Sequence, residues 1–167
     1  VLNYPEIAIA IIQSNSEKAS IFLDEIKQHF KYNETFRELF PEHVPQRSIE
    51  DWGTKEAITT EARPRSVIRR EPTILATALD KGGAGLHVDV MKFSDIVEPK
   101  NSQTRDQCSK VYRQFVQWQN VLVGPRYWID VEGTRYDFSD AYGRIIETEL
   151  DRRKKQADKY TPLWTIH

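Results

Sequence analysis

The chain has 167 residues, of which 39% are apolar and 29% are charged, with 24 lysines and arginines against 25 aspartates and glutamates. This length and composition fit one core, so residues 1–167 are expected to form a single partial domain. The net charge of -1 excludes a uniformly basic nucleic-acid-binding protein, and a site for a polyanion would have to be local. Because Cys108 is the only cysteine, a disulfide within the chain and a cysteine-based zinc site are also excluded.

The first half of the chain predicts a strand and a helix followed by shorter segments. Residues 7–12 form an unbroken apolar run, which is typical of a strand covered on both faces in a parallel sheet. Asn15 then offers a helix cap, and apolar residues recur at helical spacing as far as Phe30. Residues 33–45 predict a short helical or irregular stretch at the sheet edge. In the β-branched region that follows, residues 73–78 are the best strand candidate.

The second half alternates between strands and helices. In chain order we expect a glycine-rich loop over residues 81–85, a strand over 87–93, a helix over 104–122, a strand over 127–131, a helix over 140–155 and the start of a strand over 162–167. This order of elements favours a layered α/β domain.

Polar side chains follow two of the expected strands. Ser94 and Asp95 end one strand, and Thr134 and Arg135 follow the next. Ligands of open α/β sheets bind at the carboxyl ends of strands, so these side chains could face one crevice at the same edge. A carboxylate can hold Mg²⁺ or orient water, and a guanidinium suits phosphate. Taken separately, each segment also fits an ordinary turn, with Asp95 capping the loop and Arg135 pairing with a nearby aspartate.

Taken together, these segments resemble the ATPase domain of the large terminase subunit of tailed bacteriophages, the motor that packages DNA into the procapsid. The resemblance spans most of the chain, and its most specific part is the pair of blocks on either side of the expected long helix. The matching blocks are residues 7–19 (IAIAIIQSNSEKA), 85–89 (GLHVD), 94–97 (SDIV), 133–136 (GTRY) and 140–143 (DAYG).

The resemblance implies a three-layer α/β fold with a mostly parallel sheet of the P-loop NTPase type, incomplete at both ends. In the family, the phosphate loop would lie before Val1 and the nuclease domain after His167. None of the seven glycines precedes Lys-Ser or Lys-Thr, as the G-x-x-x-x-G-K-[ST] loop requires. We therefore expect the parent protein to be an ATPase and nuclease, and the chain alone to be inactive.

By the same resemblance, the strand that ends at Ser94 and Asp95 corresponds to the Walker B element, which binds ATP and Mg²⁺. Its first acidic position holds the metal and its second activates water; here the first position carries the neutral Ser94, which supplies an oxygen ligand without charge. Thr134 lies in the motif that couples hydrolysis to movement, with Arg135 beside it. Asp95, Thr134 and Arg135 are thus the implied catalytic residues.

The resemblance also implies partners and a location. The motor acts on double-stranded DNA, assembles as a homo-oligomer, and works with a portal protein and the small terminase subunit in the cytoplasm of the bacterial host. No apolar run approaches the ~20 residues that cross a bilayer, so no membrane association is expected.

Two other interpretations remain open at this point. The chain could be a non-catalytic α/β module that binds DNA or a protein partner through Arg63, Arg65, Arg69 and Arg70, an interpretation favoured by the missing phosphate loop and by Ser94. It could also be an unrelated helicase-like NTPase, which would share the sheet and differ over residues 133–143.

Overall fold

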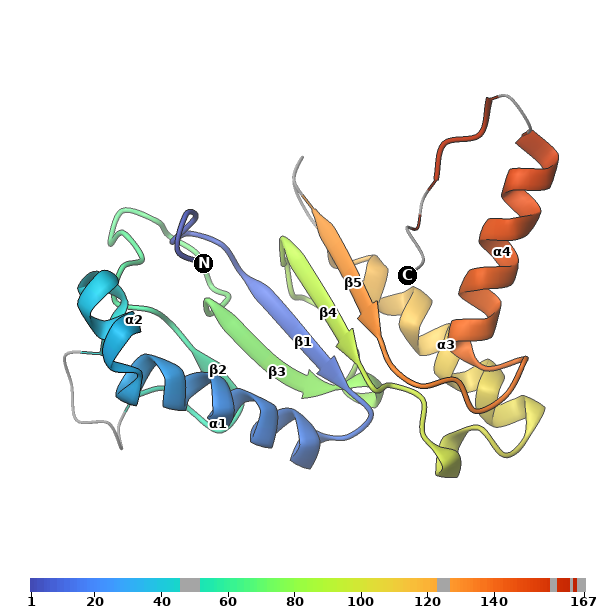
Figure 1. The fold of residues 1–167 in the computed structure, drawn as a ribbon, viewed down its shortest axis with the longest axis horizontal. Helices are drawn as coiled ribbons and strands as arrows, with labels where there is room; N and C mark the ends of the chain where they lie inside the picture. Colours follow the sequence, from blue (N-terminus) through green and yellow to red (C-terminus); the bar gives the residue numbers. More distant parts are fainter. Residues whose placement is uncertain (46–51, 123–126, 157–158, 163, 165–167) are drawn as a thin grey trace.

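The computed structural model describes residues 1–45, 52–122, 127–156, 159–162 and 164 (Figure 1). Within these residues the centre is a five-stranded sheet with the order β2-β3-β1-β4-β5. Only β2 runs antiparallel to its neighbour, so the sheet is mixed but mostly parallel, and the expected α/β class is confirmed. The strands are β1 (Ile9–Gln13), β2 (Ala57–Ile58), β3 (Ile74–Ala78), β4 (Val90–Ser94) and β5 (Trp128–Glu132).

The described part of the chain also contains four α-helices and short 3-10 turns, and α4 follows the last strand. They are α1 (Ser16–Tyr32), α2 (Glu34–Leu39), η1 (Pro41–His43), η3 (Leu79–Lys81), η4 (Pro99–Asn101), α3 (Arg105–Gln119) and α4 (Ala141–Gln156).

Local capping explains why α1 and α3 begin where they do. The Asn15 side chain accepts a hydrogen bond from the N–H of Lys18 at 3.0 Å, which satisfies one of the free donors in the first turn of α1. At α3, Thr104 and Gln107 form a capping box in which each side chain accepts from the backbone of the other residue. Both starts were predicted from the sequence.

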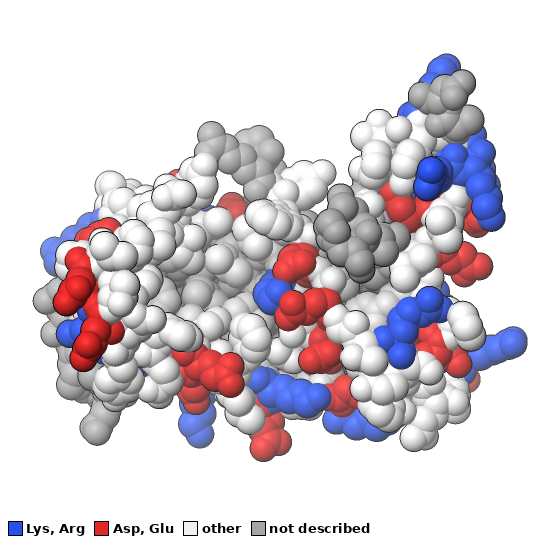
Figure 2. Space-filling view, in the orientation of Figure 1, with Lys and Arg blue, Asp and Glu red and all other residues white. Residues whose placement is uncertain are grey.

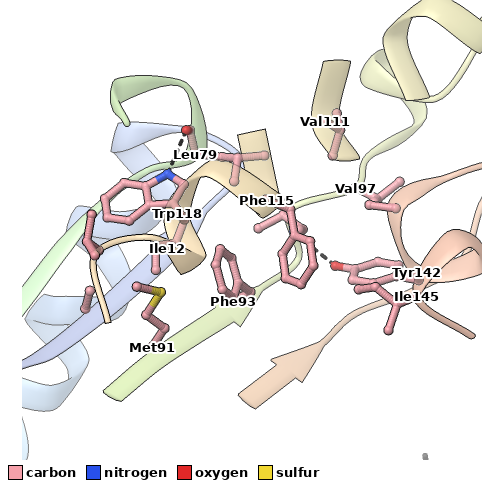
Figure 3. Close-up of a cluster of buried hydrophobic side chains, with 14 of the residues drawn as sticks. Ile12, Leu79, Met91, Phe93, Val97, Val111, Phe115, Trp118, Tyr142 and Ile145 are labelled. Carbon is pink, nitrogen blue, oxygen red and sulfur yellow. Dashed lines mark hydrogen bonds between the residues drawn. The ribbon is translucent and has the colours of Figure 1, made fainter. Parts of the chain in front are cut away.

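The sheet separates two hydrophobic clusters. On one face, Leu23 and Phe30 of α1 pack with Ile11 and Ile74 of the sheet. On the other face, α3 and α4 cover β1, β4 and β5, as Figure 3 shows. The buried residues of this second cluster include Ile12, Met91, Phe93, Phe115, Trp118 and Ile145. Since each fully buried large apolar side chain contributes about 1.5–3 kcal/mol, these two clusters fix which strands lie in the centre.

The indole N–H of Trp118 donates to the carbonyl oxygen of Leu79 at 2.9 Å (Figure 3). Both residues are buried, so this bond satisfies the only polar group of a large core side chain. It also joins the last turn of α3 to the turn after β3, at the carboxyl edge of the sheet.

The short helical stretch expected over residues 33–45 is confirmed, and its Phe36 packs against the hydrophobic cluster that includes Ile58 of the edge strand β2. This segment forms α2 and η1, and α2 packs against α1: the rings of Phe30 and Phe36 meet edge to face, with centroids 4.8 Å apart. The short sequence pattern showed an apolar face but could not show which neighbour would cover it. The strand expected over residues 162–167 lies largely outside the described residues, which include only positions 162 and 164 of that range.

In the part of the chain that the structure describes, helix α1 leaves part of this side of the sheet exposed. Helix α1 packs on β1 and β3, while the same face of β4 and β5 carries charged side chains. Lys92 Nζ lies 2.8 Å from Asp130 Oδ2 and 2.9 Å from Glu132 Oε2. Trp128 at the start of β5 is 66% exposed. Strand β5 pairs with β4 and has no second strand partner within the described ranges.

Candidate functional site at the carboxyl edge of the sheet

The ends of β4 and β5 meet at one edge of the sheet, as the sequence predicted. Ser94 is the register partner of Glu132, and the two strands run parallel. The N–H of Asp95 donates to the carbonyl oxygen of Glu132 at 3.1 Å. The turns that carry Asp95 and Thr134 therefore start at the same level of the same edge (Figure 1).

Tyr142 of α4 ties these two turns together. Its hydroxyl oxygen accepts from the N–H of Ile96 at 3.0 Å and donates to the carbonyl oxygen of Glu132 at 3.1 Å. Burial raises the pKa of Tyr142 to about 12, so the hydroxyl keeps the proton that it donates. The turn after β4 is thereby fixed from β5 and from α4 at once.

The backbone of Asp95 is unusual. Its φ of 49° is in the left-handed region, which costs free energy for any residue other than glycine, although aspartate and asparagine adopt it more readily than most. This conformation turns the chain sharply at the end of β4 and leaves the Asp95 side chain exposed while Ser94 before it and Ile96 after it are buried.

Asp95 and Thr134 line one hollow of about 400 Å³, which we term the rim hollow. The two side chains come from different segments of the sequence and are both exposed. The rim hollow also receives Lys18 from the first turn of α1 and Lys100 from η4, with the carboxylate of Glu98 between them. Two carboxylates, the Thr134 hydroxyl and two ammonium groups thus share this space.

Ser94 and Arg135 do not line the rim hollow. Ser94 is only 4% exposed and is not among the residues around the hollow. Arg135 is exposed, and its guanidinium carbon lies 5.0 Å above the centre of the Phe138 ring. Of the two aspartates suggested as its ion-pair partner, Asp137 and Asp140, Asp140 accepts from the N–H of Gly143 at 2.8 Å and so caps α4.

Glu98 is a site residue that sequence reasoning missed, as are Lys18 and Lys100. It accepts hydrogen bonds from the Ser14 hydroxyl at 2.5 Å, from Lys18, and from Lys100 at 2.9 Å. Burial alone would raise the pKa of Glu98, but the hydrogen bonds from Lys18, Ser14 and Lys100 outweigh it and lower the pKa to about 2. The position of Ser14, two residues after the strand predicted over residues 7–12, was the one available signal, since it placed a hydroxyl at the same edge.

The arginine cluster lies at the opposite edge of the sheet, and two of its members are used by the fold. Arg63 donates to the carbonyl oxygen of Ile7 at 2.8 Å, and to a second backbone carbonyl. Arg69 donates to the carboxylate of Asp89 at 2.5 Å and to the carbonyl of His87 at 2.7 Å. These bonds hold together the segments that lead into β1 and β4.

The carboxylate and hydroxyl oxygens at the rim hollow fit a magnesium ion that is also bound by the oxygens of a phosphate ligand. In proteins Mg²⁺ is held by one or two carboxylates, with the remaining positions filled by substrate oxygens and water. Asp95 supplies one exposed carboxylate, and Thr134 supplies a hydroxyl; the buried Ser94 does not fit as a direct ligand. Among the described residues no three histidine, cysteine or acidic side chains cluster as an all-protein metal site would require.

No helix in the described ranges is long and apolar enough to span a membrane. No protein-family model matches the chain, and no curated protein matches it either.

Proposed function

We propose that the chain is part of the ATPase domain of a tailed-phage large terminase subunit, an ATP-driven motor that packages double-stranded DNA into procapsids. One observation carries this proposal. Asp95 and Thr134, from the two segments that resemble the Walker B element and the coupling motif, line the same hollow at the carboxyl edge of a mostly parallel sheet. That is the edge at which α/β sheets bind nucleotides.

In this proposal Asp95 orients or deprotonates the attacking water and contacts Mg²⁺, which, when bound, neutralises charge on the phosphates. The hydrogen bond from the N–H of Asp95 to the carbonyl oxygen of Glu132 fixes the position of the Asp95 backbone, from which the carboxylate extends. Thr134 senses the γ-phosphate from the neighbouring turn. Arg135, which stacks on Phe138 in this structure, would have to leave that ring to reach the same phosphate.

The P-loop NTPase fold is also part of the proposal, and the free side of β5 supports it. Hydrolysis needs a loop of backbone N–H groups and a lysine between a strand and a helix. A strand added beside β5 would bring such a loop next to Thr134 and Asp95. The exposed Trp128 and the uncovered face of β4 and β5 are the surfaces that this strand and its helix would cover.

The partners of such a motor are part of the same proposal. They are double-stranded DNA, a portal protein, the small terminase subunit and further copies of the same chain, in the cytoplasm of the bacterial host. A nuclease activity belongs to the parent protein in the same proposal.

The competing binding module rests on the arginine cluster, and the geometry gives it less support. Arg63 and Arg69 donate to backbone carbonyls and to Asp89, which leaves Arg65 and Arg70 as the exposed members. Two exposed arginines at one edge offer few phosphate contacts, whereas DNA affinity grows with the number of phosphates neutralised.

The deciding experiment uses the complete open reading frame that contains this chain. We expect a phosphate loop followed by a helix in the additional sequence, and DNA-stimulated ATP hydrolysis by the purified protein. Asp95→Ala and Thr134→Ala should each reduce turnover by about 100-fold or more, because positioning and charge neutralisation supply nearly all of this catalysis. Thr59→Ala, at an exposed threonine beyond β2, is the matched control. Full turnover by the Asp95→Ala protein would contradict the proposal.

A further inference from the structure

We propose that Lys18 and Lys100 form a phosphate-binding pair in the rim hollow, and that Glu98 positions them. The ligand is a phosphate oxyanion, taken together with the magnesium ion that Asp95 contacts. The inference rests on the proposed function for the source of that phosphate, which is the nucleotide.

The two lysines approach one carboxylate from different elements. Lys18 comes from the first turn of α1 and Lys100 from η4, and both donate to Glu98. The Glu98 side chain is 10% exposed, whereas the side chains of Lys18 and Lys100 are 49% and 67% exposed. The carboxylate is therefore buried behind the lysines, and both ammonium groups remain open to the rim hollow.

The charges in this group do not balance on their own. Glu98 is ionised at neutral pH, and its hydrogen bond to Lys18 raises the pKa of that lysine, so all three groups are charged. Two positive charges face one negative charge, and Asp95 supplies the second negative charge of the rim hollow. Once a divalent cation neutralises Asp95, the hollow carries net positive charge and favours an anion.

The two lysines hold different oxygens of Glu98. Lys18 and Ser14 donate to Oε1, whereas Lys100 donates to Oε2 from a side chain that is 67% exposed. Lys100 can therefore turn to a phosphate while Lys18 and Ser14 still hold the carboxylate. Lysine is suited to this role because its ammonium group acts as a mobile point charge toward phosphate oxygens.

Figure 2 shows that basic and acidic side chains alternate along the edge where the strands end, with no broad basic field. Such a surface does not attract polyanions in general. It favours a small ligand that brings its own cation, which is the form in which nucleotides bind.

The test measures binding of inorganic pyrophosphate to the 167-residue chain by calorimetry, with Mg²⁺ present. Lys18→Gln and Lys100→Gln should each weaken binding about tenfold, because each removes a hydrogen bond from a charged donor. Lys18→Arg keeps the charge and should retain most of the affinity. Lys31→Gln, which removes the same charge from the last turn of α1, should bind as the unmodified chain does.

Thermal unfolding of each variant separates loss of binding from loss of fold. Lys100 is the more exposed of the two lysines, so Lys100→Gln remains informative if Lys18→Gln proves unstable. Absence of pyrophosphate binding, or equal binding by the folded Gln variants and the unmodified chain, overturns the inference.

Two further arms identify the source of the phosphate and separate this inference from the proposed function. The lysine variants should bind ATP more weakly than the unmodified chain does, as they do pyrophosphate, whereas their affinity for a short DNA duplex should not change. Weaker binding of the duplex with unchanged binding of ATP would overturn the assignment to nucleotide. If the full-length protein hydrolyses ATP but its lysine variants bind pyrophosphate normally, this inference is wrong and the proposed motor function is supported. If pyrophosphate binding depends on the lysines but the full-length protein has no ATPase activity, the proposed motor function is wrong and the phosphate-binding site is supported.

Discussion

The backbone N–H of Asp95 donates to the carbonyl oxygen of Glu132 across 3.1 Å. Asp95 is the first residue after β4, and Glu132 is the last residue of β5, so this bond continues the pairing of the two strands into their turns. A movement of the turn after β5, where Thr134 lies, would therefore also move the backbone of Asp95. In the proposed motor, this bond connects the residue that handles water to the segment that couples hydrolysis to movement.

We expect Tyr142→Phe to destabilise the protein by about 2 kcal/mol. The substitution removes the hydroxyl that bonds to Ile96 and Glu132 and leaves a buried N–H without its partner. Urea unfolding measures the loss, and Tyr32→Phe, at a tyrosine that is 59% exposed, should change stability little. Equal stability of the two variants would show that the hydroxyl does not hold the two turns.

Gly133→Ala should destabilise the folded protein more than a glycine substitution elsewhere on the surface. A Cβ at Gly133 would lie 2.1 Å from the Tyr142 hydroxyl oxygen, so the ring would have to move and its hydrogen bonds would be lost. We expect a cost of about 2 kcal/mol or more.

Gly82→Ala is the matched control for Gly133→Ala. Gly82 also has a positive φ, of 69°, but a Cβ there meets no atom within 4 Å, so its expected cost is only the backbone strain of about 1 kcal/mol. Unfolding midpoints of the two proteins distinguish the effects. A smaller loss of stability from Gly133→Ala than from Gly82→Ala would mean that the Tyr142 ring does not lie tightly against Gly133.

Glu98 should make stability depend on pH in the acidic range. Its pKa falls from 4.5 to about 2 on folding, so its stabilisation is fully present above about pH 5 and is lost as the pH drops toward 2. A difference of this size corresponds to about 3 kcal/mol. Glu98→Gln cannot titrate, so the stability gap between it and the unmodified chain should narrow from pH 7 to pH 2.5.

The control for the pH experiment is Glu25→Gln, at an exposed position of α1. Its stability should follow that of the unmodified chain at every pH. A gap between the Glu98→Gln variant and the unmodified chain that stays constant with pH would show that Glu98 is not held by its lysines in solution.

The 167-residue chain alone should hydrolyse ATP feebly or not at all. No glycine precedes Lys-Ser or Lys-Thr, so the loop that holds the β- and γ-phosphates is missing from this sequence. A phosphate-release assay with excess ATP and Mg²⁺ measures the rate. Turnover that Asp95→Ala abolishes would reveal a phosphate-binding element that the sequence does not show.

Much of the local structure followed from the sequence. The continuous apolar run predicted β1, although pairing begins at Ile9 and extends to Gln13. The cap at Asn15 gave the start of α1, because a cap acts on N–H groups within the next three residues, and the helical spacing from residue 104 onward gave the start of α3. The edge at which Asp95 and Thr134 meet was also predictable, since parallel strands end on the same side.

The tertiary structure alone decided which charged residues serve the site and which serve the fold. Ser14, Lys18 and Glu98 meet only because β1 lies beside β4, and the arginines near residue 63 are bound to the fold at the other edge because carbonyls from distant segments converge there. Neither contact leaves a local pattern. Strand order depends on packing between segments far apart in the sequence, and a single sequence encodes that packing only in the sum of many small contacts.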